Sequence, residues 1–381
     1  MIPLAIPNLS GNEARYLQQC IDSSFVSSVG PFVTKFEEMI SEISGSNKTT
    51  ATSSGTTGLH SALTAVGVKY NDLVILPSFT FIGSANSISH CGAVPWLFDV
   101  NPITWTLNVN QLHDALKSKT IRTKEGLIHK ESGKRVSAIM PVYVLGIPAE
   151  MDEICRIAKD FSLPIVADAA CALGMTYKKK KIGEMGADLS VFSFNGNKTV
   201  TSGGGGAVSG SSIELVQSVY HLTTTARVGS DYDFDRVGFN YRLTNIQAAV
   251  GCAQLERLEE FVQSKRNIQK QYNDALLQIE GISPFPDPAY GESSCWFSGV
   301  QVNSKIHKPV SEIRKELRAN EIDARPFWKP IHLQKPYEHS PKESLDFTDN
   351  LWMDILTLPC STSLSQSDQS KVILAVKNIL S

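Results

Sequence analysis

A single lysine, Lys198, lies between an apolar segment and four consecutive glycines in the stretch SFNGNKTVTSGGGG (193–206). Lysine is seldom buried, and a glycine run costs conformational entropy when the chain folds. A partly buried lysine loses proton affinity and becomes a nucleophile for carbonyl groups. A flexible linker is the alternative for the glycines, but they precede an apolar strand, so we expect them to let the backbone pass close to a ligand.

An acidic residue, Asp168, ends the strongly apolar stretch PIVADA (164–169). A carboxylate at such a position is costly unless it is paired or hydrogen-bonded. It either caps the next helix or serves a ligand, and the stretch alone does not decide between the two.

Two further stretches place polar or aromatic groups where a strand gives way to a helix. In ATSSGTTGLHSAL (51–63), a helix opens at Gly55-Thr56-Thr57. A helix N-terminus presents free N–H groups and a positive dipole end, which suit a phosphate, although Ser and Thr also cap helices that bind nothing. In PSFTFIGSANSI (77–88), two phenylalanines follow the strand, and we assign Phe79 to the core.

Together these groups are the parts of a pyridoxal phosphate (PLP) site. The aldehyde of PLP needs a lysine, and its pyridine nitrogen needs a carboxylate that holds the ring proton and keeps the ring an electron sink. The ring needs an apolar or aromatic cover. The phosphate needs hydroxyl groups and a helix N-terminus.

The elements that must position these groups are short apolar runs that alternate with helical patterns between residues 50 and 210. We expect strands at 73–78, 94–99, 137–142, 164–169, 189–194 and 205–210. Between them, stretches such as AEMDEICRIAKDF (149–161) have the apolar spacing of a helix. This alternation predicts a mainly parallel sheet covered on both faces, with ligands bound beyond the carboxyl ends of its strands.

A long helical pattern from Thr244 to Ile279 is expected to lead into a second domain. We place the boundary at residue 260, with a large domain at 1–260, which includes the N-terminal segment, and a small domain at 261–381. The polar segment 120–135 is expected to be a surface excursion, and the lysine run 178–181 a solvated turn.

Composition excludes several classes of protein. The chain has 381 residues and a formal net charge of -2, so nothing in its charge favours nucleic acid. Its N-terminus has no signal-peptide pattern, and no apolar run approaches the roughly 18 residues of a membrane span. The seven scattered cysteines form no CxxC and the histidines no HExxH, which predicts a cytoplasmic protein with no metal site.

The ordered set of motifs resembles the DegT/DnrJ/EryC1/StrS family of sugar-nucleotide aminotransferases over nearly the whole chain. The resemblance is carried by SSGTTGLH, PSFTFIGSANSI, VADAACALG, GADLSVFSFNGNK with SGGGG, GFNYRLTNIQAAVG, RPFWKPIHLQ and LPCSTSLS. It implies the α/β aspartate-aminotransferase fold (PLP fold type I), with a mostly parallel seven-stranded sheet in a large domain and a smaller α+β C-terminal domain.

The resemblance also implies roles for matching residues. Lys198 would be the Schiff-base lysine, and Asp168 would pair with the pyridine nitrogen. The other implied cofactor contacts are Phe81 stacked on the ring, the Thr56 and Thr57 N–H groups with the Ser193 hydroxyl on the phosphate, and Cys171 near the phenolic oxygen, where the family usually has Gln, His or Glu. Asn240, in GFNYR, would reach the phosphate of a neighbouring subunit, which implies a homodimer with shared active sites.

The substrate side is implied in the same way, by Arg325, Trp328, Lys329 and His332. The motifs FSFNGNK, LTTTAR (222–227) and RPFWKPIHLQ resemble those of one branch of the family. That branch aminates C4 of UDP-4-keto-6-deoxy-N-acetylhexosamines for surface polysaccharides, including lipopolysaccharide. L-Glutamate is the expected amino donor. GDP-4-keto-6-deoxymannose and a keto-octulosonate are alternative substrates within the family. The alternative of another class is a non-catalytic sugar-nucleotide sensor or scaffold, against which intact Lys198 and Asp168 argue.

Overall fold

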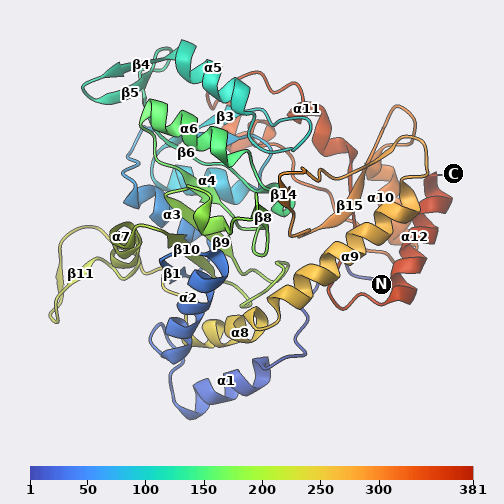
Figure 1. The fold of residues 1–381 in the computed structure, drawn as a ribbon, viewed down its shortest axis with the longest axis horizontal. Helices are drawn as coiled ribbons and strands as arrows, with labels where there is room; N and C mark the ends of the chain where they lie inside the picture. The colour runs from blue at the N-terminus through green and yellow to red at the C-terminus, as the bar shows by residue number, and fades with distance from the viewer. Residues whose placement is uncertain (381) are drawn as a thin grey trace.

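The computed structural model describes residues 1–380, and its larger part is built around one sheet (Figure 1). Its seven strands follow the order β1 (Lys48–Thr52), β10 (Gly206–Gly210), β9 (Leu189–Ser193), β7 (Val166–Asp168), β6 (Arg135–Ile139), β2 (Leu73–Pro77) and β3 (Val94–Phe98). Isolated parallel bridges, Ile139 with Ile165 and Val142 with Asp168, join the two halves between β6 and β7. Only β10 runs antiparallel to its neighbours. The predicted mostly parallel sheet is therefore confirmed.

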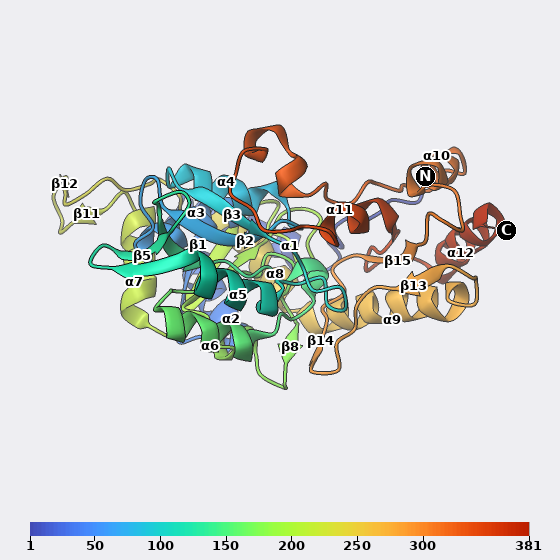
Figure 2. The ribbon, with the colours of Figure 1, turned by 90° about the horizontal axis from the view of Figure 1, so that it is seen from above.

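Both faces of this sheet are buried, because successive side chains of a strand point to opposite faces. Leu73 and Ile75 of β2 belong to one apolar cluster, and Val74 and Leu76 belong to another. The first cluster is completed by α2 (Pro31–Ser44), α5 (Val109–Lys119), α6 (Met151–Phe161) and α8 (Asn245–Leu255), and the second by α3 (Gly55–Ala65), α4 (Ile82–His90) and α7 (Ile213–Thr223). Figure 2 shows α3 and α4 on one side of the sheet and α5 and α6 on the other.

Of the two polar segments, 120–135 forms regular structure and 178–181 forms a turn. Residues 120–135 contain the hairpin β4 (Thr120–Thr123) and β5 (Gly126–His129), and β5 pairs antiparallel with β6. The surface excursion is therefore an extension of the sheet. The lysines at 178–181 are exposed and turn between β8 (Thr176–Tyr177) and the 3-10 helix η2 (Ile182–Glu184), as predicted.

The long helical pattern forms two helices, α8 and α9 (Leu258–Leu276), and α9 leads to a third apolar cluster. That cluster is built on α9, α10 (Val310–Ala319), α12 (Gln366–Leu380) and a sheet of β13 (Ile282–Pro284), β15 (Ser298–Val302) and β16 (Ile355–Leu358). The boundary at residue 260 stays a prediction. Two facts bear on it: α9 runs through it without a break, and the N-terminal Leu4 packs in the C-terminal cluster.

The remaining elements are α1 (Glu13–Asp22), β11 (Arg227–Val228), β12 (Asp233–Phe234), β14 (Gly291–Glu292), α11 (Thr348–Leu351), η1 (Val144–Gly146), η3 (Ile331–Leu333), η4 (Lys335–Tyr337) and η5 (Trp352–Asp354). The β11–β12 hairpin projects from the end of the molecule opposite the two chain termini (Figures 1 and 2). No helix among residues 1–380 combines the length and apolar character that crossing a bilayer requires.

Candidate active site

A cavity of about 470 Å³ opens beyond the carboxyl ends of the parallel strands and is closed on its far side by C-terminal segments. Eight of the predicted site residues line it: Thr56, Phe81, Asp168, Cys171, Ser193, Lys198, Arg325 and Trp328. The other four, Thr57, Asn240, Lys329 and His332, do not. The topology explains the convergence, because the ends of parallel strands meet at one edge of the sheet.

Asp168 is the last residue of β7 and is only 6% exposed. Its Oδ2 accepts a hydrogen bond from the Ser84 hydroxyl at 2.7 Å, and its Oδ1 accepts one from the Ala170 N–H at 3.1 Å. Burial raises the pKa of the Asp168 carboxyl, while these two hydrogen bonds and the charge of Lys198 oppose that rise. The Ala170 contact is a local cap, but the Ser84 contact comes from another element, so the acid is more than a helix cap.

Lys198 extends from the loop after β9 into the same cavity. Its Nζ lies 3.1 Å from the Cys171 sulfur and 4.0 Å from the centre of the Trp296 ring. Burial raises the pKa of the Cys171 thiol, and the charge of Lys198 opposes that effect. A neutral thiol therefore stands where a carboxamide, imidazole or carboxylate was expected.

The N-terminus of α3 faces the cavity with fewer free donors than predicted. Ser54 caps the helix, and its hydroxyl accepts the Thr57 N–H at 3.1 Å. The Thr57 N–H is therefore already donated within the chain, because a capping serine uses the N–H three residues on, and its contact with the phosphate stays a prediction. Thr56 lines the cavity, and a methyl group built on Gly55 would meet the Ser193 side chain at 3.0 Å. The start of α3 and the end of β9 thus meet at one wall.

The last glycine of the run, Gly206, packs closely against protein backbone. A methyl group on Gly206 would lie 2.5 Å from the Ser54 carbonyl oxygen and 2.7 Å from the Gly55 nitrogen. Gly203 and Gly205 have φ of 74° and 121°, in the region that favours glycine. Gly206 therefore lets β10 approach the first turn of α3.

Aromatic side chains cover one side of the cavity. Phe81 caps α4 and is 54% exposed, with its ring centre 6.1 Å from that of Trp328. Phe79 is fully buried against Phe327, as predicted for a core residue. A large flat side chain left exposed in a cavity wall is available to cover a planar ligand.

The basic residues predicted for the substrate side lie at or beyond the cavity mouth. Arg325 lines the cavity, but its guanidinium is paired with Asp323 at 2.9 Å. Lys329 is exposed and lies outside the cavity-lining set. Of these two cations, only Arg325 therefore lines the cavity that holds Lys198.

His332 makes structural contacts within the chain, and its predicted contact with substrate stays a prediction. It is 6% exposed; its Nδ1 lies 2.7 Å from the Ser78 hydroxyl and its Nε2 lies 2.6 Å from the Asp349 carboxylate. These partners hold the segment after Pro330 against the end of β2. The imidazole has no nitrogen left for a ligand.

Asn240 is exposed and does not reach the cavity of its own chain. The residue after it, Tyr241, accepts the Ser53 N–H at 2.7 Å through its carbonyl oxygen. Asn240 therefore lies next to a residue that contacts the chain just before α3, and its own side chain is exposed.

Sequence reasoning missed three residues that the structure places in the cavity wall: Ser84, Asn197 and Trp296. Ser84 lies in a quoted motif, and a polar residue on a buried helix face was the only available signal. Asn197 precedes the lysine and has a buried side-chain oxygen with no partner. Trp296 comes from nearly 100 residues further along the chain, and no local pattern marks it.

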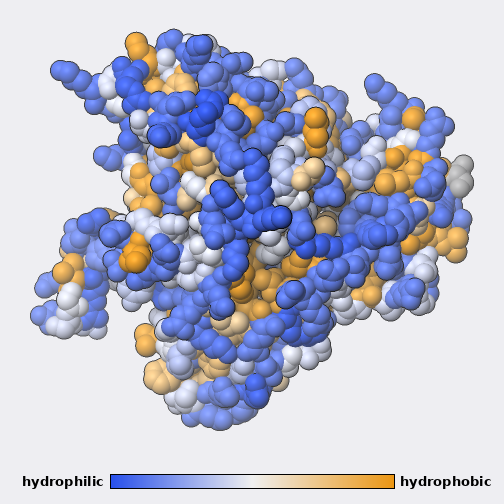
Figure 3. Space-filling view, viewed as in Figure 1, coloured by the Kyte–Doolittle hydropathy of each residue, from blue (hydrophilic) through white to orange (hydrophobic). Residues whose placement is uncertain are grey.

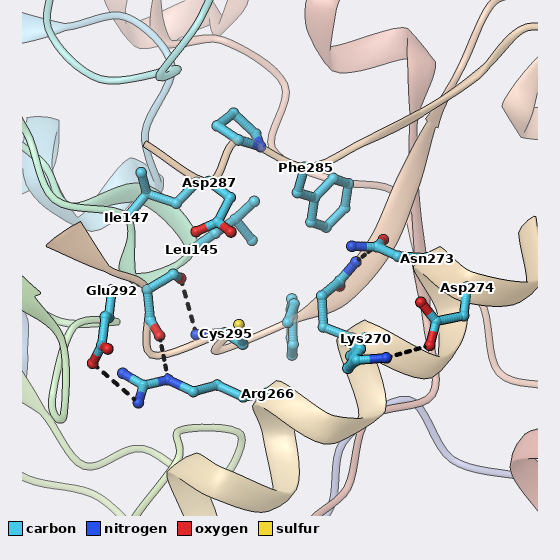
Figure 4. Close-up of a pocket in the computed structure, with 14 residues that line it drawn as sticks. Leu145, Ile147, Arg266, Lys270, Asn273, Asp274, Phe285, Asp287, Glu292 and Cys295 are labelled. Atoms are coloured by element: carbon cyan, nitrogen blue, oxygen red, sulfur yellow. Dashed lines mark hydrogen bonds and ion pairs between the residues drawn. The ribbon is translucent and has the colours of Figure 1, made fainter. Parts of the chain in front are cut away.

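A second cavity of about 420 Å³ lies behind this wall, between α9 and the segment 285–297 (Figure 4). Its cations are already paired. Arg266 contacts Glu292 at 3.4 Å and Lys270 contacts Asp274 at 2.6 Å, as the dashed lines show. Cys295 lines this second cavity, while the next residue, Trp296, lines the first.

The fold and the first cavity define a PLP enzyme of the aspartate-aminotransferase type, and comparison with known proteins places the chain more closely. The model of the DegT/DnrJ/EryC1/StrS aminotransferase family matches residues 7–377, so the chain belongs to this family. GDP-perosamine synthase of Caulobacter vibrioides is 36% identical over 384 residues, covering 100% of this chain and 98% of the relative. The GDP-perosamine synthase of Escherichia coli O157:H7 is 34% identical, covering 96% and 94%. A family aminotransferase from Brucella abortus has TM-score 0.88 at 28% identity, covering 97% and 95%.

The chain is therefore a PLP-dependent sugar aminotransferase. The residues present fit this cofactor, since the cavity holds a lysine amine, a buried carboxylate and a helix N-terminus in one enclosure. The buried carboxylate is the telling feature: Asp168 has an unfavourable burial that a positively charged ring nitrogen would relieve.

Proposed function

We propose that this enzyme transfers an amino group to the C4 keto group of a GDP-linked 4-keto-6-deoxy sugar, of the GDP-4-keto-6-deoxymannose kind. Two relatives named GDP-perosamine synthase, each more than 30% identical over nearly the whole chain, support it. The UDP-4-keto-6-deoxy-N-acetylhexosamine substrate rests on motif wording alone and becomes the second candidate. A non-catalytic sensor finds no support among these relatives.

The observation that carries the proposal is the meeting of Lys198 and Asp168 in one cavity. When bound, PLP supplies the electron sink for moving an amino group. Asp168 would hold the proton of the ring nitrogen. The hydrogen bonds that Ser84 and Ala170 donate to its two oxygens fix the orientation of the carboxylate. Lys198 would bind the aldehyde and then move a proton at the reacting carbon, which requires its amine to become neutral.

The first turn of α3 and the end of β9 would hold the phosphate. Unused N–H groups of a first helical turn suit an anion, and Thr56 and Ser193 add hydroxyls on the same side. Phe81 would cover the ring. Cys171 would lie near the phenolic oxygen, where its thiol is a poor donor.

The substrate side would be formed by Arg325, Trp328 and Lys329. Pairing with Asp323 leaves Arg325 partly neutralised. A diphosphate would therefore meet the exposed Lys329, which has no carboxylate partner among residues 1–380. L-Glutamate is the proposed donor. Both substrates bear anionic groups, for which these cations at the entrance are suited.

The active site would be completed by a second copy of the chain. Asn240 faces away from its own cavity, and the neighbouring β11–β12 hairpin carries four exposed apolar or aromatic side chains: Val228, Tyr232, Phe234 and Val237. Figure 3 shows apolar atoms on this projecting hairpin at the lower left. A homodimer in which Asn240 reaches the partner's phosphate would account for both features. All seven cysteines are free, which agrees with a cytoplasmic enzyme of polysaccharide biosynthesis.

Two measurements test the proposal. Borohydride reduction of the PLP-loaded protein should fix the cofactor on Lys198, as read by peptide mass spectrometry; attachment elsewhere would overturn the site. The pyridoxamine form should then be mixed with matched GDP- and UDP-linked 4-keto-6-deoxy sugars while the return of the PLP absorbance is followed. If the PLP absorbance returns faster with the GDP sugar, the proposal is supported. A faster return with the UDP sugar would instead favour the second candidate substrate.

A further inference from the structure

Trp296 is the aromatic side chain that contacts the amine of Lys198. The Nζ atom of Lys198 lies 4.0 Å from the ring centre of Trp296 and 3.1 Å from the sulfur of Cys171. A cation over an indole face is attracted by the negative face of the ring, and tryptophan is the strongest of the aromatic side chains in this respect. Sulfur adds a weak acceptor.

The Trp296 ring is held rigidly and is only 3% exposed. Its Nε1 donates to the Asn197 carbonyl oxygen at 2.7 Å, which ties it to the residue before the lysine. Its ring stacks on that of Phe297 with centres 3.9 Å apart and planes 16° apart. The ring is therefore a fixed wall and does not depend on Lys198 for its position.

The backbone around Trp296 is also tied to the segment that carries Cys171. The Ser294 hydroxyl donates to the Cys171 carbonyl oxygen at 2.8 Å, and the Ser294 N–H donates to Gly146 at 3.1 Å. On the far side, the Arg266 Nε donates to the Ser293 carbonyl oxygen at 2.9 Å, in the second cavity (Figure 4). One C-terminal segment thus fixes both groups that touch the amine.

We propose that Trp296 and Cys171 form a resting site for the free amine of Lys198, which makes Trp296 a positioning residue of the transfer reaction. The inference rests on the proposed role of Lys198. Whenever the lysine is not covalently bound, its ammonium is held over the ring, inside the cavity. The ring favours the charged amine and so fixes where it lies before it reacts.

The test measures Lys198 itself in the full-length protein reconstituted with pyridoxamine 5′-phosphate, where the cofactor offers no aldehyde. Trace acetic anhydride labels neutral amines, and the labelling rate of Lys198 is read by mass spectrometry across a pH series. Trp296→Leu removes the ring face that holds the ammonium, and Lys198 should then be labelled about tenfold faster, the fold-change expected for losing one cation–π contact. Trp296→Phe keeps a ring face and should stay within about threefold of wild type.

The variants separate a contact with the amine from a merely structural role. Trp296→Phe also loses the hydrogen bond to Asn197, so an equal effect in the Phe and Leu variants would overturn the inference, as would unchanged labelling in Trp296→Leu. Trp352→Phe is the matched control for losing an indole elsewhere, in η5, and should leave Lys198 labelling unchanged.

If Trp296→Leu fails to fold, Cys171→Ser serves in its place. A hydroxyl is a better acceptor than a thiol, so this variant should slow the labelling of Lys198, and faster or unchanged labelling would contradict the resting site. Failure of the proposed function is seen separately. Borohydride that does not fix PLP on Lys198 overturns that function, whereas normal fixation with unaltered labelling in the variants overturns only the resting site.

Discussion

The hydroxyl of Ser84 should control the protonation of Asp168, and removing it offers a sensitive test of the site. Ser84 donates to Oδ2 of Asp168 at 2.7 Å, and its own oxygen lies 2.7 Å from the Thr80 hydroxyl. In Ser84→Ala one of the two protein hydrogen bonds to a buried carboxylate is lost. Hydrogen bonds to charged groups contribute about 1.5–3 kcal/mol, which corresponds to roughly one to two pKa units.

The direction of the pKa change follows from the charge that Asp168 carries when it is ionised. Losing a donor disfavours the ionised carboxylate, so the pKa of Asp168 should rise further above its usual value. The ionised carboxylate is the form that would hold the cofactor's ring proton. As the pH is lowered, the variant should therefore lose activity at a higher pH than wild type does. We expect the acid limb of the kcat/KM profile to be displaced upward by about one to two pH units, so kcat/KM on that limb should fall by about 10- to 100-fold.

The assay is the pH dependence of kcat/KM for wild type, Ser84→Ala and Ser87→Ala. Ser87 lies on the same helix, is equally buried and donates to the Ser84 carbonyl oxygen at 2.7 Å, but does not touch Asp168. Ser87→Ala should therefore change stability without moving the acid limb. If the acid limbs of the two variants coincide, Ser84 does not act through Asp168 and the reasoning fails.

Three further predictions follow from single contacts. Asp168→Asn should abolish transfer yet raise the melting temperature of the cofactor-free protein at neutral pH, because burial raises the pKa of this carboxyl and its ionisation opposes folding above that pKa; a lower melting temperature would contradict this. Gly206→Ala should weaken PLP binding more than tenfold, since its methyl group would overlap the Ser54 backbone at 2.5 Å. In the control Gly196→Ala, the added methyl group has nothing within 4 Å and should not disturb α3. Spectrophotometric titration with PLP compares the two variants. Burial and His90 lower the pKa of His60 to about 4, so wild type should lose up to about 3 kcal/mol of stability, less screening, as the pH falls from 6.5 to about 4. Urea titrations of His60→Leu should show a smaller loss, and an equal loss would assign it to other groups.

The sequence by itself was sufficient to predict a mainly parallel sheet and the chemistry at the ends of its strands. Strands such as LVILP are continuous apolar runs because both faces of a parallel strand are covered. Asp168 and Lys198 follow strands β7 and β9, and parallel topology alone brings such ends to one edge. Local patterns therefore predicted the α/β fold class and the cofactor correctly, and they singled out two residues, Asp168 and Lys198, that line one cavity.

Only the tertiary structure decided what surrounds those two residues. Trp296 meets Lys198, and Ser84 meets Asp168, across separations that leave no periodic or local signal. His332 stands in a motif that suggested substrate, yet its partners Ser78 and Asp349 fill both ring nitrogens. Gly206 was expected beside a ligand and instead contacts the backbone of Ser54. The physical reason is common to all four: the partner of a buried polar group or a close backbone contact is chosen by packing, and packing joins segments that the sequence keeps apart.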